Sequence, residues 1–70
     1  MAATANLRKR LGETIRTHRG AIDLSQEKLA ELADLSCNYI GEVERGETNV
    51  SIEALARIAK AVKVHIRDLL

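Results

Sequence analysis

The chain has 70 residues and a formal net charge of +1, which leaves room for one small domain and excludes a strongly basic or acidic protein. Hydrophobic residues make up 46% of the sequence, which argues against a disordered chain. Tyr39 is the single aromatic residue and proline is absent, whereas good helix formers such as leucine, alanine, glutamate and arginine dominate. We therefore expect residues 1–70 to form one all-α domain with an aliphatic core and with residues 1–5 as a flexible N-terminus.

Several classes of protein are excluded at this stage. Cys37 is the single cysteine, so neither an intrachain disulfide nor a cysteine-based zinc site is expected. No apolar run approaches the roughly 20 residues of a membrane span, and no signal-peptide core follows Met1, so we expect a cytoplasmic protein without a membrane partner. No nucleophile–base pair, phosphate-binding glycine loop or metal-ligand spacing is present. The sequence predicts a protein that is not an enzyme, with no cofactor, no metal and no small-molecule effector.

Apolar periodicity and capping residues predict five helices. The first helix carries apolar-face residues at spacings of three and four, namely Leu7, Leu11, Ile15, His18 and Ile22. The chain then breaks at residues 23–24, and Ser25 is the expected N-cap of a short second helix.

Two further serines, Ser36 and Ser51, are the expected N-caps of the third and fourth helices. The third helix is expected from Cys37 to about Arg45, and Gly46 ends it because glycine readily adopts the left-handed conformation after a helix. The fourth carries apolar residues at helical spacing, and a final short helix is expected over residues 65–70.

The second and third helices are the informative pair. Each is only about eight or nine residues long, with a turn of about three residues between them, so packing must hold them in place. Two short helices joined in this way predict a helix-turn-helix, whose second helix can enter the major groove of DNA.

The sequence of this pair resembles one family. The run LSQEKLAELADLS at residues 24–36, followed by YIGEVERG at residues 39–46, is similar to the Cro/C1-type (XRE-like) helix-turn-helix family. Residues 51–62 resemble the fourth helix of that family and residues 11–19 its first. The resemblance covers residues 7–70 and implies a five-helix, lambda-repressor-like DNA-binding domain that acts as a transcriptional regulator.

The resemblance also implies roles for individual residues. Four positions on the third helix would face base edges: Cys37, Asn38, Gly41 and Glu42. Five residues would contact DNA phosphates: Gln26, Ser36, Tyr39, Arg45 and Asn49. Asn38 is the strongest candidate, because its amide can pair bidentately with adenine, while Glu42 could accept from cytosine. Arg19 and Glu44 match a pair that bridges the first and third helices in the family.

Two features depart from the family pattern. Asp23 and Asp34 stand where the family usually has glycine in a left-handed turn, a conformation that aspartate tolerates better than most residues. The middle of the chain is also acidic, with two basic residues against eight acidic ones over residues 23–53. Phosphate attraction on the third helix therefore depends on Arg45, unless the basic residues of the first helix approach the DNA.

A homodimer on a palindromic operator is the expected working form, because one small domain makes few base contacts and two-fold symmetry supplies a second half-site. The expected interface residues are Ile66, Leu69 and Leu70, which stand at the chain end with little left to cover them.

Three alternatives stay open at the level of the sequence. The chain could regulate a restriction–modification operon, it could be the antitoxin of a toxin pair, or it could be a protein-interaction module that kept the fold without DNA affinity. The acidic third helix favours the last of these.

Overall fold

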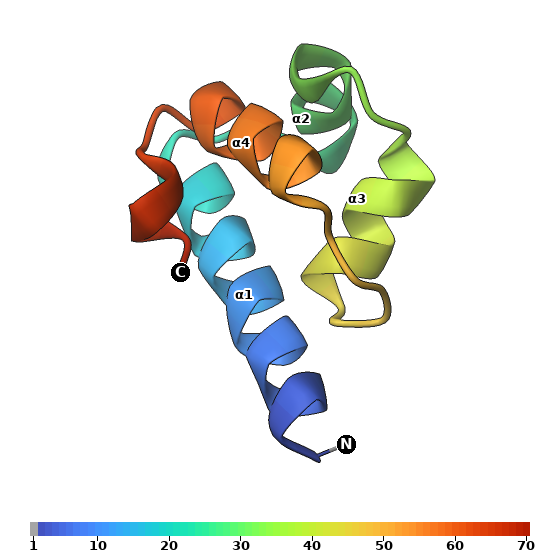
Figure 1. The fold of residues 1–70 in the computed structure, drawn as a ribbon. Coiled ribbons are helices and arrows are strands. Elements are labelled where there is room, and N and C mark those ends of the chain that lie inside the picture. The colour runs from blue at the N-terminus through green and yellow to red at the C-terminus, as the bar shows by residue number, and fades with distance from the viewer. Residues whose placement is uncertain (1) are drawn as a thin grey trace.

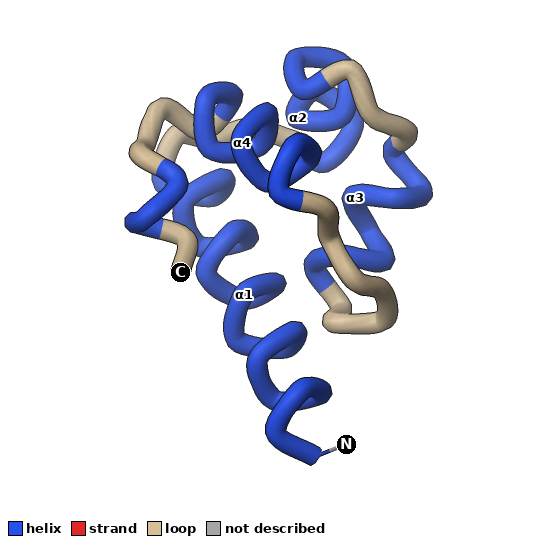
Figure 2. The backbone as a smooth tube through the Cα atoms, in the orientation of Figure 1, coloured by secondary structure: helices blue, strands red, loops and turns tan. Residues whose placement is uncertain are grey.

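The computed structural model describes residues 2–70, with side chains described from Asn6 onward. Four α-helices follow one another along the chain, α1 (Ala2–Ala21), α2 (Gln26–Ala33), α3 (Cys37–Glu44) and α4 (Ile52–Ala61), before a single 3₁₀ turn, η1 (Ile66–Asp68). The described residues contain helices and loops and no strand (Figure 2), which confirms the all-α class. Met1 lies outside the described residues, and the flexible N-terminus expected at residues 1–5 stays a prediction.

The structure does not contain the predicted fifth α-helix. The expected final helix over residues 65–70 is one 3₁₀ turn, in which the amide of Asp68 donates to the carbonyl of His65 at 2.9 Å and that of Leu69 to Ile66 at 3.0 Å. Lys63, just after α4, takes a left-handed φ of 66°, and the residues that follow it form only this one turn.

The helix boundaries follow the predicted capping residues. The hydroxyls of Ser25, Ser36 and Ser51 each accept a hydrogen bond of 3.0 Å from the backbone amide three residues later, at the start of α2, α3 and α4. Asp23 and Asp34 adopt left-handed φ values of 53° and 56°, as expected for residues that replace glycine in these turns. These caps and turns fix where α3 begins and therefore which of its residues point outward.

The core lies where the four helices meet. Its fully buried side chains are aliphatic and come from every helix and from the residue after α4: Ile15, Leu29, Ile40, Ile58 and Val62. Helix α4 crosses α2, and α1 packs against α3 on one side and the C-terminal residues on the other (Figure 1). Helix α3 is therefore held from behind by α1 and α2.

Leu69 belongs to this core, contrary to its expected place in a dimer interface. Only 2% of its surface is exposed, because η1 folds the chain end back against the helices of the same molecule. Leu70 is 77% exposed, and Ile66 is half-buried against the core.

Helices α1 and α3 approach each other closely at Gly12. A Cβ atom at this position would lie 2.4 Å from the carbonyl oxygen of Glu44 and 2.5 Å from that of Val43, so no larger residue fits without moving α3. Sequence periodicity does not reveal this constraint, because Gly12 interrupts no apolar pattern.

A buried ion pair makes the second link from α1 to α3. Arg19 Nε donates to Glu44 Oε2 at 2.7 Å and Arg19 Nη2 donates to Oε1 at 3.0 Å, while only 2% of the Glu44 side chain is exposed. Gln26 Nε2 of α2 donates to the same Oε1 at 2.9 Å, and Arg19 Nη1 donates to the carbonyl of Leu24 at 2.8 Å. The hydrogen bond and charge of Glu44 hold the pKa of Arg19 above its ordinary value. One carboxylate thus ties α1, α2 and α3 together.

We predict that Gly12→Ala destabilises the fold by about 2 kcal/mol or more, because the added methyl group forces two backbones apart. Gly20→Ala in the same helix is the matched control, since no atom lies within 4 Å of its Cβ position. This control should stabilise the helix slightly, because alanine has the higher helix propensity. Urea denaturation followed by circular dichroism measures both changes, and equal effects would contradict the close approach.

We further predict that Glu44→Ala lowers the free energy of unfolding by about 3 kcal/mol, because it leaves the Arg19 charge and the Gln26 amide without their buried partner. Glu31→Ala is the control, since Glu31 forms an exposed ion pair with Lys28 at 2.7 Å and its loss should be nearly neutral. Thermal and urea unfolding would refute a structural role for Glu44 if both variants matched the wild type.

Candidate nucleic-acid interface

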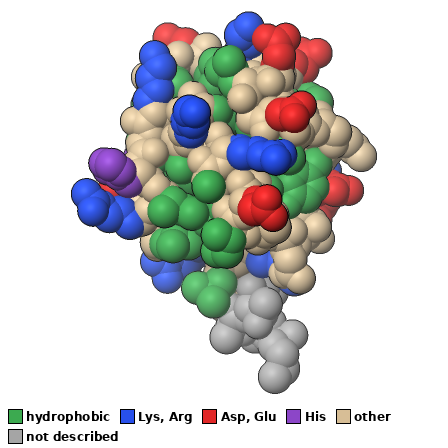
Figure 3. Space-filling model, turned by 45° about the horizontal axis from the view of Figure 1, so that its top comes forward, with side chains coloured by type: hydrophobic (Ala, Val, Ile, Leu, Met, Phe, Trp, Pro, Cys, Tyr) green, Lys and Arg blue, Asp and Glu red, His purple; other side chains and the backbone are tan. Residues whose placement is uncertain are grey.

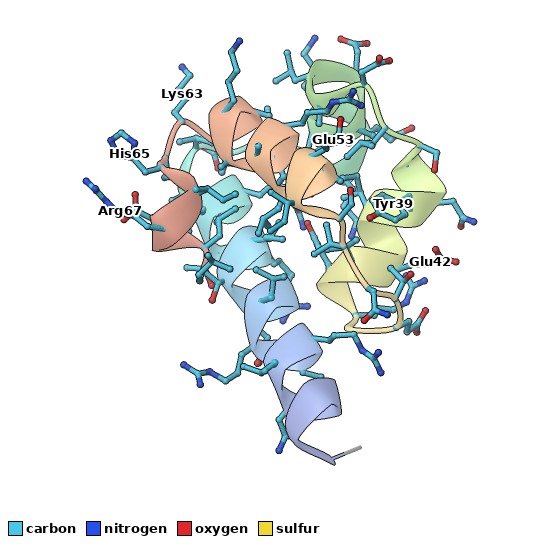
Figure 4. All side chains as sticks on the ribbon, in the orientation of Figure 1. Tyr39, Glu42, Glu53, Lys63, His65 and Arg67 are labelled. Carbon is cyan, nitrogen blue, oxygen red and sulfur yellow. The ribbon has the colours of Figure 1, made fainter. Side chains whose placement is uncertain are left out.

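The outward face of α3 carries the residues expected to read DNA bases. Ile40 and Val43 point into the core, so Cys37 and Asn38 are exposed at the start of the helix and Glu42 lies one turn further on, half-buried. Figure 4 shows Glu42 pointing away from the helical body. Asn38 and Glu42 are four residues apart and therefore lie on one face, within reach of a groove of DNA laid along α3.

Gly41 differs from its expected role. It is buried, and a Cβ atom at this position would lie 3.0 Å from Arg45 Nη1, so the Arg45 side chain covers it. A base edge reaches Gly41 only if the guanidinium group of Arg45 moves aside. Because the Arg45 side chain is long and exposed, rotation about its single bonds is enough to move it.

Arg45, an expected phosphate ligand, forms an ion pair with Glu47. Its Nε donates to Glu47 Oε2 at 2.9 Å, and both side chains are more than half exposed. The hydrogen bond and charge of Glu47 raise the pKa of Arg45, and those of Arg45 lower the pKa of Glu47. This exposed pair is weak enough for a phosphate to replace Glu47 as the partner of Arg45.

Two other expected phosphate ligands already have structural partners. Ser36 Oγ accepts the capping bond from Tyr39 but keeps its own O–H free to donate. Gln26 Nε2 donates to buried Glu44 and keeps a second N–H. Both residues therefore combine an inward bond that fixes the side chain with an outward donor.

Asn49 lies in the loop that follows α3, beside Tyr39. The hydroxyl of Tyr39 is 3.5 Å from the backbone oxygen of Asn49, to which it donates. Asn49 Oδ1 accepts from Arg8 Nη1 of α1 at 3.1 Å, across 41 positions in sequence. The structure thus brings the Asn49 backbone next to Tyr39, in the first turn of α3.

Arg8 is the residue that sequence reasoning did not place. Its guanidinium group reaches the loop after α3, and Lys9 packs against Gly46 in the same loop. Arg8 Nε is buried without a hydrogen-bond partner among the described residues. Two basic residues of α1 therefore lie next to the loop that follows α3. In the sequence, the run of basic residues at 8–10 was the only indication of this contact. The direction in which they face depends on how α1 crosses α3.

Among the described residues, no cluster of histidine, cysteine or carboxylate side chains could hold a metal ion, and no helix is both long and apolar enough to cross a membrane. Cys37 is free and exposed.

The sequence and the fold have counterparts in known proteins. A family model described as "Helix-turn-helix" matches residues 15–69. Control protein C.SmaI of Serratia marcescens is 42% identical over 65 residues, which cover 93% of this chain and 77% of the relative. Control protein C.BamHI of Bacillus amyloliquefaciens is 43% identical over 68 residues, which cover 96% of this chain and 84% of the relative.

A solved structure of a controller protein has the same fold. The restriction-modification controller protein C.AhdI from Aeromonas hydrophila superposes with a TM-score of 0.88 at 40% identity, over 90% of this chain and 96% of that one. The chain therefore belongs to the helix-turn-helix family of the Cro/C1 (XRE-like) type.

Proposed function

We propose that this protein is a sequence-specific DNA-binding transcriptional regulator that places α3 in the major groove and represses transcription. The observation that carries the proposal is the presentation of α3. Its inner face is fixed by the core and by buried Glu44, while Asn38 and Glu42 face outward together. A rigid helix with polar side chains on one exposed face is what base recognition requires.

The acidic character of α3 does not exclude DNA. Glu44 is buried and paired with Arg19, so it adds no free negative charge to the surface. Arg8 and Lys9 stand beside the loop after α3 and supply positive charge next to it. The relatives are named as control proteins, which supports a regulator over an interaction module without DNA affinity. C.AhdI is named as a restriction-modification controller protein, which favours a restriction–modification system as the narrower context.

The proposed contacts are those that the family resemblance implies. We infer that Asn38 and Glu42 read bases, with Cys37 beside them and Gly41 accessible after Arg45 moves. Phosphate contacts fall to five residues at the two ends of α3: Gln26, Ser36, Tyr39, Arg45 and Asn49.

The proposal is tested by selecting bound duplexes from a random pool with purified protein. Enrichment of a palindrome with half-sites about one helical turn apart supports a regulator that binds as a two-fold dimer. Absence of any enriched sequence would overturn the proposal in favour of the interaction module.

We predict that Asn38→Ala weakens binding to the selected duplex by about tenfold to a hundredfold and relaxes the base preference at one position, since a bidentate amide contact is lost. Arg67→Ala is the control: it removes a whole charge, but from exposed η1, so its effect should be much smaller. Fluorescence anisotropy at moderate salt measures both. An Asn38→Ala variant with unchanged affinity and preference would remove Asn38 from the interface.

The second copy has a candidate surface. Leu70 is 77% exposed and Leu7 is 62% exposed, and both line one hollow with Leu11, Val50 and the buried Leu69. Leu69 thus lies at the bottom of this hollow and does not project towards a partner. We propose that a two-fold partner covers Leu7 and Leu70, with Ile66 at the edge.

We predict that Leu70→Asp weakens self-association by at least tenfold, because each copy loses a leucine that the dimer would bury and gains a charge there. Leu32→Asp is the matched control, since Leu32 is 53% exposed on a different surface. Sedimentation equilibrium of both variants gives the answer. Equal association by both would rule out this interface.

A further inference from the structure

A groove of about 470 Å³ lies between the C-terminal turns of α2 and α4. It is at the top of the molecule in Figure 1, whereas the loop that follows α3 is at the lower right. None of its lining residues belongs to α3, to the predicted DNA contacts or to the hollow beside Leu70. The groove is therefore unexplained by the proposed function.

The lining combines an apolar wall with a basic rim. Leu32 is 53% exposed, and it lines the groove with Ala33 and Ala61. The rim carries three exposed cations, Arg57, Lys60 and Lys63. Figure 3, in which the top of the molecule comes forward, shows basic side chains on this side of the molecule, with apolar and acidic ones among them.

These three cations have no ion-pair partner among the described residues. Elsewhere the exposed pairs form readily, as Lys28–Glu31 and Arg45–Glu47 show. Asp34 is the one acidic residue in the lining and forms no ion pair with them. The groove thus keeps a net positive charge that no ion pair among the described residues neutralises.

The backbone conformation at Lys63 is also unusual for a lysine. Lys63 holds a φ of 66°, the left-handed conformation that glycine adopts at lowest cost after a helix. The position therefore places a second lysine beside the groove, next to Lys60, where local folding would favour glycine. Like charges on one rim repel each other, and an anionic ligand would relieve that repulsion.

We propose that this groove docks a short segment of a partner protein in which acidic residues flank a leucine or a similar apolar side chain. The acidic residues would meet Arg57, Lys60 and Lys63, and the apolar side chain would lie against Leu32. A peptide suits the groove better than nucleic acid, because DNA phosphates would face an exposed leucine and the carboxylate of Asp34. The proposal does not depend on DNA binding, since none of the lining residues of the groove belongs to α3.

The probe is a short fluorescein-labelled peptide of leucine and glutamate in which glutamates flank every leucine. We expect it to bind the full chain and to shift the backbone NMR signals of Leu32, Ala33 and Ala61 most strongly. Replacing its glutamates by glutamine, or its leucines by serine, should abolish binding. The affinity should fall as salt rises, since the rim charges are exposed.

The double variant Lys60→Glu/Lys63→Glu should bind the peptide about tenfold more weakly, because two attractions become repulsions. Arg16→Glu/Arg67→Glu is the matched control, with the same change of charge at exposed sites outside the groove. Leu32→Ser tests the apolar wall without changing charge. Circular dichroism verifies that every variant is folded.

The proposal is overturned if the peptide does not bind, if the two double variants bind it equally, or if the glutamine peptide binds as well as the glutamate one. The selected duplex is titrated against the same variants. Loss of DNA affinity only in Lys60→Glu/Lys63→Glu would assign the groove to nucleic acid instead. Unchanged DNA affinity with lost peptide binding supports protein docking, whatever the outcome for the DNA-binding role.

Discussion

The buried carboxylate of Glu44 is the constraint on which the rest of the structure depends. It accepts hydrogen bonds from Arg19 of α1 and Gln26 of α2, and it belongs to the last turn of α3. A helix of eight residues has little stability of its own, so its orientation comes from such tertiary contacts. A buried ion pair contributes little net free energy, but removing one partner is expensive, and this asymmetry disfavours arrangements in which α3 tilts away. The close approach of α1 to α3 at Gly12 restricts the same helix sterically. Charge and packing therefore determine one position for α3.

This constraint links the core to the DNA-facing surface. Gln26 bonds inward to Glu44 and Ser36 bonds inward to the amide of Tyr39, and each keeps a donor directed outward. Their side chains are thus ordered before any DNA arrives, which reduces the entropy lost on binding. The loop after α3 is ordered in the same way by Arg8, whose guanidinium group holds Asn49. The surface that we assign to DNA is therefore preorganised at both ends of α3, and its free negative charge is smaller than the count of acidic residues suggests.

The sequence predicted the elements well, because each boundary has a local cause. Ser25, Ser36 and Ser51 bond to amides three residues away, and Asp23 and Asp34 turn the chain through their own backbone angles. The prediction of a last α-helix was wrong: the chain turns at left-handed Lys63, and residues 66–68 form a 3₁₀ turn. The burial of Leu69 was not predicted, because it depends on how η1 packs against α4. The position of Arg8, the cover of Gly41 by Arg45 and the groove beside Lys63 also depend on how helices cross, and periodicity along one helix does not contain that information.

The central claim is that α3, held by Glu44, is the surface that meets DNA. It is tested most directly by NMR, with the selected duplex titrated into isotope-labelled protein and the backbone shifts mapped onto the sequence. The account predicts that the largest shifts fall on residues 36–42 and on Gln26, with smaller shifts at Asn49 and little change at Lys60 and Lys63. Shifts centred on the α2–α4 groove, with α3 unchanged, would contradict it.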